Sequence, residues 1–453
     1  MAKYELDMTR GPISQQIVRY STPLLLTGIL QLFYNAADTI VVGQFAGKMA
    51  LASVGATGIV SGLLVNLFMG LSAGSSVVTA NSYGAGNFQR IRAAVHTSIT
   101  VAAICGVFLI FAGFGLIRPL LELMNTPADI IDGSTLYLKI IFLGAPFNLI
   151  YNFGSAILRA MGDTRRPLFF LCISGLVNVL LNLLFVIVFH MSVVGVALAT
   201  IIAQAVSAIM VLCCMIRSDG YIHLDLKKLS IDRDIFKELL RIGLPAGLQN
   251  SLFSISNILI QSSINSFGSD AVAGDSAACS LEGFVGCITA AIHDTTITFS
   301  GQNYGAKQYR RMRKGYVRCV LFGGLACVVV GNLVYLFHEP LLRLYNSDPN
   351  VIEMGRIRML CIFPFYLIGA LLNINSGQLR GMGYSVIPTI ISLTGTVAFR
   401  VFWIYVVFMP FPTLLNLYMV YPISWGLMAL ALYVLYIVVR RKLPKEDQPL
   451  ASV

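Results

Sequence analysis

The chain has 453 residues, of which 57% are hydrophobic and only 12% are charged. Soluble domains carry about 25% charged residues, so this composition argues against an ordinary soluble enzyme or binding module. The formal net charge of +11 could indicate a nucleic-acid partner, but the Lys and Arg residues gather in loops between apolar segments, as they do in membrane proteins, and we expect no nucleic acid to bind.

Apolar runs recur along the whole chain, and each has the length of about 20 residues that a membrane-spanning helix needs. We therefore predict an all-α integral membrane protein that lies in a lipid bilayer. The twelve predicted spans are 15–43, 53–80, 94–117, 132–159, 167–189, 193–216, 238–265, 273–300, 316–337, 352–380, 386–408 and 414–439.

The loops between the spans alternate in charge. One side carries most of the Lys and Arg, including Arg90 and Arg92 after the second span and the basic run 307–314 after the eighth. The opposite side holds little more than Lys48, Arg118 and Arg343. Because basic loops stay in the cytoplasm, this asymmetry predicts that both termini are cytoplasmic, which requires an even number of spans.

The two halves of the sequence resemble each other at an offset of 221 to 222 residues. The polar loop "NSYGAGNFQRIR" (81–92) matches "QNYGAKQYRRMR" (302–313), and "LRAMGDTRRP" (158–167) matches "LRGMGYSVIP" (379–388). Each repeat has six spans, so both repeats insert in the same orientation. We predict two six-helix bundles related by a pseudo-twofold axis, as in parallel-repeat transporters: an N-terminal lobe (1–216), a cytoplasmic linker (217–237) and a C-terminal lobe (238–453).

The polar motifs also resemble those of a known family. "YNAADTIVVGQ" in the first span, "YGAGN" and "QNYGAK" after spans two and eight, and "LRAMGD" and "LRGMGY" after spans four and ten are similar to the multidrug and toxic compound extrusion (MATE) transporters. The acid in "CSLEGFVG" of span eight is similar to the DNA-damage-inducible-type branch. The resemblance implies the MATE fold and a monomer in a bacterial plasma membrane. It also implies export of amphipathic, often cationic compounds by alternating access, without a cofactor and coupled to H⁺ or Na⁺.

One face of the first span carries a polar stripe that ends in a carboxylate. Gln31, Tyr34 or Asn35, and Asp38 follow one another at steps of three and four residues, which favours a face turned into the protein. The alternative is that Asp38, close to the outer end of the span, only reaches the lipid headgroups. We predict that Gln31, Tyr34 and Asn35 handle substrate or protons.

Spans five and six offer polar partners for Asp38. Asn178 and Asn182 are one turn apart in span five, and Thr200 lies in span six. By resemblance to the family, Asp38, Asn178, Asn182 and Thr200 would form the coupling site for a proton or Na⁺. Many relatives have aspartate where this chain has Asn182, so only one carboxylate remains. The alternative is that the two asparagines join helices by hydrogen bonds.

The C-terminal lobe differs from this pattern. Asn257 corresponds to Asn35, whereas Ile260 stands in the place of Asp38. Glu282, near the middle of span eight, could pair with a cationic substrate or carry a proton, or it could be a structural acid. Asp294, in the inner half of that span, could act at a cytoplasmic gate, pair between the lobes or be structural. We count it with Glu282 and Asn257 among the candidate substrate or proton residues.

Two other functions remain open from the sequence. A flippase for lipid-linked or other polar lipids would be expected to line its cleft with basic residues, whereas the intramembrane charges here are mostly acidic. The sequence positions of Arg358 and Arg400 place them near span ends. An intramembrane enzyme would need a nucleophile–base pair or a metal motif, and ATP-driven transport would need a Walker sequence; none of these motifs occurs.

Overall fold

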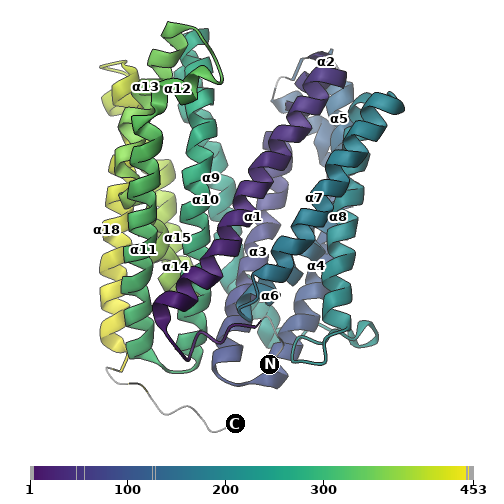
Figure 1. Cartoon of the computed structure of the whole chain (residues 1–453), viewed down its shortest axis with the longest axis vertical. Coiled ribbons are helices and arrows are strands. Elements are labelled where there is room, and N and C mark those ends of the chain that lie inside the picture. The colour runs from purple at the N-terminus through teal and green to yellow at the C-terminus, as the bar shows by residue number, and fades with distance from the viewer. Residues whose placement is uncertain are drawn as a thin grey trace. The chain divides into compact units, whose positions relative to one another are not determined.

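The computed structural model describes residues 5–46, 48–55, 57–124, 126–127, 129–444 and 447 (Figure 1). The described chain is helical and contains no β-strand. Its first half contains α1 (Ile13–Val41), η1 (Val42–Ala46), α2 (Lys48–Gly55), α3 (Gly58–Gly84), α4 (Phe88–Leu123), α5 (Ile131–Leu143), α6 (Ala145–Ala160), α7 (Arg165–Leu183), η2 (Leu184–Val188), α8 (Ser192–Ile216) and η3 (Leu226–Lys228). Its second half contains α9 (Arg233–Asn265), α10 (Ser269–Gly305), α11 (Tyr309–Leu336), α12 (His338–Arg343), α13 (Pro349–Ile362), η4 (Phe363–Phe365), α14 (Tyr366–Gly381), α15 (Val386–Leu393), η5 (Thr394–Ala398), α16 (Phe399–Trp403), η6 (Ile404–Phe408), α17 (Leu414–Tyr418) and α18 (Val420–Lys442).

Every predicted span coincides with a helix or with consecutive helices. Among the described residues, nine helical segments are long and apolar enough to cross a membrane, and the pair α5 and α6, bent by 47° at Gly144, makes a tenth. The other two predicted spans are α3 and α9, with 27 and 33 residues. At 1.5 Å per residue both are longer than the hydrocarbon core of about 30 Å. The prediction of an all-α membrane protein is confirmed.

The internal contacts divide the chain into two compact units. Unit 1 is Met1–Asp7 with Ile29–Ser251, and unit 2 is Met8–Gly28 with Leu252–Val453. These units differ from the predicted lobes because α1 and α9, the first helix of each repeat, each contribute to both units. The predicted linker 217–237 counts with unit 1, and its last residues already belong to α9.

The repeat seen in the sequence is also a repeat of backbone conformation. The matching loops after α3 and α10 turn through Gly86 and Lys307, which have φ of 66° and 56°. Both N–H groups bond the carbonyl three residues earlier at 3.0 Å, which closes the helix end in the same way. After α6 and α14 the chain turns through Gly162 and Gly383, with φ of 88° and 87°, a conformation that favours glycine.

Helix neighbours repeat between the two units as well. In unit 1, α3 packs on α4 and α6, and α6 packs on α4 and α8. In unit 2, α10 packs on α11 and α14, and α14 packs on α11 and α18. Each unit has its own buried apolar clusters, so each bundle is held together by its own core.

Within unit 1, α3 and α9 approach each other through glycines. Gly70 and Gly74 on α3 face Gly243 and Gly247 on α9, so each helix carries small residues four positions apart. A Cβ on Gly70 would lie 2.1 Å from the backbone nitrogen of Gly247. Small residues at such spacing let membrane helices pack backbone to backbone. This close packing stabilises the helix pair, because in lipid there is no hydrophobic driving force between helices.

We predict that Gly70→Ala destabilises unit 1. The new methyl group meets backbone atoms that cannot rotate away, so the free energy of unfolding should fall by about 1–3 kcal/mol. Gly115→Ala is the matched control, because a Cβ on Gly115 of α4 meets nothing within 4 Å. Thermal unfolding of the purified variants in detergent measures both. Equal melting temperatures for the two variants would contradict the close packing of α3 on α9.

Candidate functional site

The first polar cluster lies in unit 1, where α1, α7 and α8 meet. Asn182 Nδ2 donates to Asp38 Oδ1 at 2.5 Å and to Asn178 Oδ1 at 3.3 Å. Asn178 Nδ2 donates to Thr200 Oγ1 at 3.5 Å, and that hydroxyl donates to the carbonyl of Val196. The structure therefore brings the four predicted coupling residues into one hydrogen-bonded chain.

Local structure explains how the two asparagines serve this cluster. They lie one turn apart on α7, on the side that is buried, with exposed fractions of 6% for Asn178 and 1% for Asn182. The helix then widens into the π-helical segment η2 directly after α7. Such bulges inside α-helices are frequent at functional sites. The asparagines bond Asp38 and Thr200 on the neighbouring helices as well as each other.

The predicted polar stripe of α1 divides into two sets in the structure. Tyr34 and Asp38 are half-buried and turn to α7, where the Tyr34 hydroxyl donates to the carbonyl of Cys172 at 3.3 Å. Gln31 and Asn35 are exposed. The ring of Tyr34 lies directly over Gly175, since a Cβ there would come within 1.9 Å of it. Glycine at position 175 therefore leaves room for the Tyr34 ring against α7.

The atoms of this cluster suit a small hard cation. One carboxylate, the Asn178 and Asn182 side-chain oxygens and the Thr200 hydroxyl are the oxygen ligands that Na⁺-like ions prefer. Asn182 Oδ1 is buried and has no hydrogen-bond partner among the described residues, which leaves an acceptor available. Asp38 is the one acid of the four, so a proton taken up here would sit on its carboxyl group.

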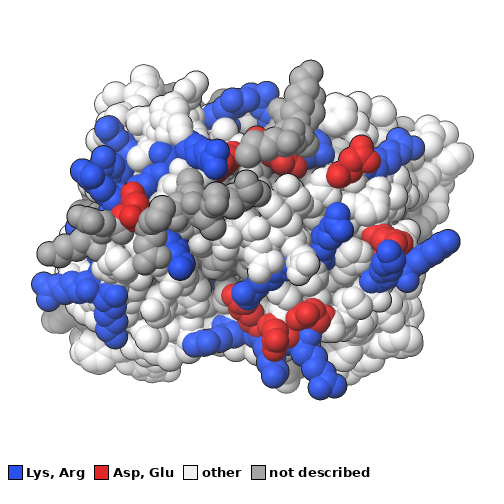
Figure 2. All heavy atoms as spheres, turned by 90° about the horizontal axis from the view of Figure 1, so that it is seen from below, with Lys and Arg blue, Asp and Glu red and all other residues white. Residues whose placement is uncertain are grey.

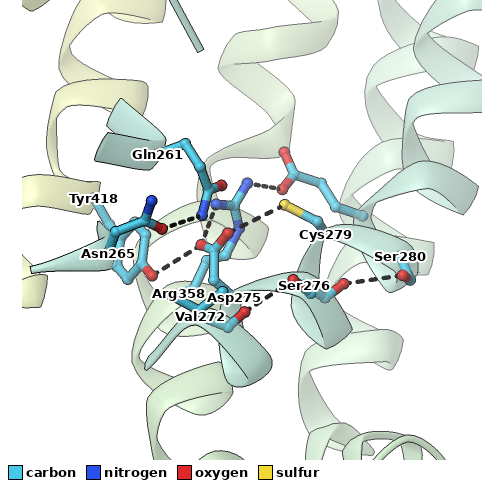
Figure 3. A network of polar contacts seen from close by, with 10 residues as sticks. Gln261, Asn265, Val272, Asp275, Ser276, Cys279, Ser280, Arg358 and Tyr418 are labelled. Atoms are coloured by element: carbon cyan, nitrogen blue, oxygen red, sulfur yellow. Dashed lines mark hydrogen bonds and ion pairs between the residues drawn. The ribbon is translucent and has the colours of Figure 1, made fainter. Parts of the chain in front are cut away.

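A second polar cluster, in unit 2, holds four charged or hydroxyl-bearing side chains. Arg358 on α13 donates through Nη1 to Asp275 Oδ1 at 2.6 Å and through Nη2 to Glu282 Oε2 at 2.7 Å. The Tyr418 hydroxyl also donates to Asp275 Oδ1, at 2.9 Å. Figure 3 shows Arg358 and Tyr418 converging on Asp275. The charge of Glu282 is thus balanced within the unit by an arginine.

Close helix packing places these groups. A Cβ on Gly274 of α10 would lie 2.6 Å from the backbone nitrogen of Gly355 on α13, so the two helices touch there. Arg358 lies about one turn beyond Gly355, and Asp275 follows Gly274 directly. The side chains of Arg358 and Asp275 are 6% and 3% exposed, whereas that of Glu282 is 18% exposed.

Two arginines near span ends point into unit 2. Arg358 and Arg400 are both buried, at 5% and 0% exposure. Arg400 Nη1 donates to Asn257 Oδ1 at 2.9 Å, and the guanidinium lies over the Tyr421 ring at 4.6 Å. Its Nε and Nη2 are buried without a hydrogen-bond partner in the described chain. A long side chain near a span end can point inward as readily as toward the headgroups.

Sequence reasoning also missed Asp275. It lies seven residues before Glu282, a spacing that places both acids on one face of α10. That spacing was one signal in the sequence. Arg356 and Arg358 in the span 352–380 were a second signal, because they could supply the opposite charge. The other predicted residue of α10, Asp294, lies within electrostatic range of Arg380. Its neighbour His293 donates through Nδ1 to the carbonyl of Asn373 at 2.8 Å. Asp294 and Glu282 therefore belong to separate clusters.

Comparisons with known proteins agree with this architecture. A family model described as MatE matches residues 23–184 and 245–406. The two matched segments are offset by 222 residues (245 − 23 = 222), which agrees with the offset of the sequence repeat. The chain is 28% identical over 386 residues to the probable multidrug resistance protein YoeA of Bacillus subtilis, which covers 83% of this chain and 82% of that protein. It is 28% identical over 399 residues to the probable multidrug resistance protein NorM of Thermotoga maritima, with coverage of 84% and 82%.

A solved structure shares the fold. The crystal structure of MATE in complex with MaL6 superposes with a TM-score of 0.91 at 22% identity, covering 98% of this chain and 99% of that one. The predicted fold and family resemblance are confirmed.

We predict that Arg358→Gln strongly destabilises unit 2. It leaves Asp275 and Glu282 buried without their counter-charge, which typically costs about 3–5 kcal/mol. Arg356→Gln is the matched control on the same helix, because Arg356 pairs with Glu353 where both side chains are over 40% exposed. Such an exposed pair contributes about 0–1 kcal/mol. Thermal unfolding in detergent compares the two variants.

The triple variant Asp275→Asn, Glu282→Gln, Arg358→Gln removes the arginine and both acids, so no charge remains in the cluster. It should recover most of the stability that Arg358→Gln loses. A melting temperature of the triple variant as low as that of Arg358→Gln alone would show that the loss does not come from unpaired charge.

Proposed function

Because the chain belongs to the MATE family of transporters, we propose that it is an antiporter that exports amphipathic organic compounds in exchange for H⁺ or Na⁺. The observation that carries this proposal is the chain of hydrogen bonds from Asp38 through Asn182 and Asn178 to Thr200. It supplies one ionisable group, surrounded by neutral oxygen ligands, inside a membrane helix bundle.

Cation uptake at Asp38 would change the contact between α1 and α7. The Asn182 amide donates to the Asp38 carboxyl group. A proton would neutralise that carboxylate, and Na⁺ would be held by the carboxylate with the oxygens of Asn178, Asn182 and Thr200 as neutral ligands. Either ion would weaken the attraction between Asp38 and the Asn182 donor. Because α1 contributes residues to both units, a change at this contact can bias alternating access.

Unit 2 provides the acid that would meet a cationic compound. Glu282 is the more exposed of the two carboxylates that share Arg358. The ammonium group of a substrate would compete with the Arg358 guanidinium for Glu282. Aromatic rings of the unit would contact the apolar part of the substrate. Asn257 and Asp294 remain candidate substrate or proton residues of the same unit, and Gln31, Tyr34 and Asn35 those of α1.

One observation favours a second candidate function, the flipping of a lipid-linked or other polar lipid. Arg400 carries two buried donors, Nε and Nη2, without a partner among the described residues. An anionic headgroup would satisfy them. Export of an anionic lipid analogue that needs Arg400 but not Asp38 would favour this function over cation-coupled drug export.

We further propose a monomer in the bacterial plasma membrane with both termini in the cytoplasm. Figure 2 views the molecule from below, where α1 begins and α18 ends in Figure 1, and Lys and Arg side chains predominate over Asp and Glu on this face. Cytoplasmic surfaces carry such an excess of basic residues. Residues 1–4 and most of the C-terminal tail lie outside the described residues.

We predict that Asp38→Asn abolishes gradient-driven export. The substitution keeps the size of the side chain and removes its charge, so neither H⁺ nor Na⁺ can drive the change at α1. The measurement is export of a fluorescent amphipathic cation from proteoliposomes, with Na⁺ and pH gradients imposed separately. It measures the loss and identifies the coupling ion. Asp132→Asn is the control, an exposed acid of the same unit that pairs with Arg118.

The proposal makes two demands on this experiment. Wild-type and Asp132→Asn protein must respond to at least one of the two gradients, and Asp38→Asn must respond to neither. Export by Asp38→Asn at the wild-type rate under the same gradient would remove Asp38 from the coupling mechanism.

A further inference from the structure

A groove lies between α11 and α18 in unit 2. Both helices pack on α14, and two adjoining cavities of about 710 Å³ and 530 Å³ open beside them. The cavities share Tyr316 and Val317 of α11 and Tyr433 of α18, so they form one continuous groove along the helices. In Figure 1, α11 and α18 run next to each other in this unit.

The two ends of the groove differ in chemistry. The larger cavity lies at the beginning of α11 and the end of α18. Among the described residues, its lining includes no acid and four basic residues: Arg313, Lys314, Arg318 and Arg440. The smaller cavity lies farther along both helices and is mainly apolar, with Val320, Ile368, Leu371, Gly426, Ala429 and Leu430 in its lining. From Arg313 to Val320 the distance along the helix is about 10 Å.

A buried hydroxyl without a partner marks the basic end. Tyr436 lines the larger cavity, is 1% exposed, and its hydroxyl has no hydrogen-bond partner among the described residues. Its ring lies 4.6 Å from that of Tyr316, whose own hydroxyl donates to Asn375 Oδ1 at 2.7 Å. Arg313 and Arg440 lie within electrostatic range of Tyr436. An unpaired buried donor beside two cations calls for an anionic or ester oxygen.

The corresponding region of unit 1 is covered by the chain itself. His96 Nε2 and Thr97 Oγ1 near the beginning of α4 accept backbone N–H groups of the linker, from Asp225 and Asp232. Tyr221 of the linker stacks on Phe88 at 3.7 Å. At the repeat offset of 221, Thr97 corresponds to Arg318 (97 + 221 = 318). Unit 2 therefore has a basic residue where unit 1 has a hydroxyl that binds the linker.

We propose that this groove binds one anionic phospholipid of the cytoplasmic leaflet. Its phosphate lies among Arg313, Lys314, Arg318 and Arg440, the Tyr436 hydroxyl donates to a phosphate or ester oxygen, and an acyl chain follows the apolar cavity toward α14. Basic pockets between membrane helices on the cytoplasmic side recognise such headgroups. The assignment rests on the proposed orientation of the chain and is independent of the coupling site at Asp38.

Native mass spectrometry of the purified full-length protein tests the proposal, with phosphatidylglycerol and phosphatidylcholine of the same acyl chains as probes. The wild type should retain phosphatidylglycerol preferentially. Arg318→Gln with Arg440→Gln should weaken that binding about tenfold or more, since each basic residue contributes attraction to anionic lipid. Arg310→Gln with Arg441→Gln is the matched control, on the same two helices and with the same charge change, but outside the lining of both cavities.

Tyr436→Phe gives a second reading that leaves the charges unchanged. It should weaken phosphatidylglycerol binding by a smaller factor than the loss of the two arginines does. None of these measurements involves transport, so a failure of the coupling proposal leaves them interpretable.

Four results would overturn the assignment. Equal retention of the two lipids by the wild type would exclude headgroup recognition, and equal loss in both arginine pairs would reduce it to surface charge. Competition by inorganic phosphate as effective as that by phosphatidylglycerol would make this a site for free anions. If a variant lacking residues 445–453 binds the lipid and the full-length protein does not, the C-terminal tail is the natural occupant of the groove.

Discussion

Polar side chains in a membrane bundle must find partners inside the protein, because the hydrocarbon around them offers no water. This requirement explains the contacts that distinguish each unit. Asp38 is held by the amide of Asn182, and Asp275 shares Arg358 with Glu282. Arg400 uses Asn257 and the face of Tyr421. Each contact joins different helices, so satisfying a polar group also fixes how the helices pack.

Close backbone approach is what allows these short contacts. Gly175 admits the ring of Tyr34, and Gly274 meets Gly355 beside the cluster of Arg358. A larger residue at Gly175 would displace the Tyr34 ring, and one at Gly274 would meet backbone atoms of α13. Buried ion pairs of this kind often contribute little net stability, because their desolvation offsets their attraction. The charges of unit 2 are therefore better explained by specificity or transport than by stability.

The sequence predicted the helices well because apolar length and repeated polar loops are local signals. It also predicted the partners of Asp38, since Asn178 and Asn182 share a helix face and the family resemblance supplied Thr200. It did not predict that Gln31 and Asn35 are exposed while Tyr34 and Asp38 face α7, because all four fit one broad stripe. Nor did it place Arg358 and Arg400, whose long side chains reach inward from positions that equally suit the headgroups. Those directions depend on packing between helices distant in sequence.

The repeat keeps its backbone while its polar chemistry diverges. The turns at Gly162 and Gly383 have the same backbone conformation, but the contact between the first and fifth spans differs in charge. In the first repeat a carboxylate on α1 meets an amide on α7. In the second repeat an amide on α9 meets a guanidinium on α16. A carboxylate among neutral oxygens can exchange a mobile cation with water. A guanidinium is a cation that cannot leave and that stays protonated in proteins. Cation exchange is therefore chemically available at this helix pair in unit 1, whereas in unit 2 the chain itself supplies the cation.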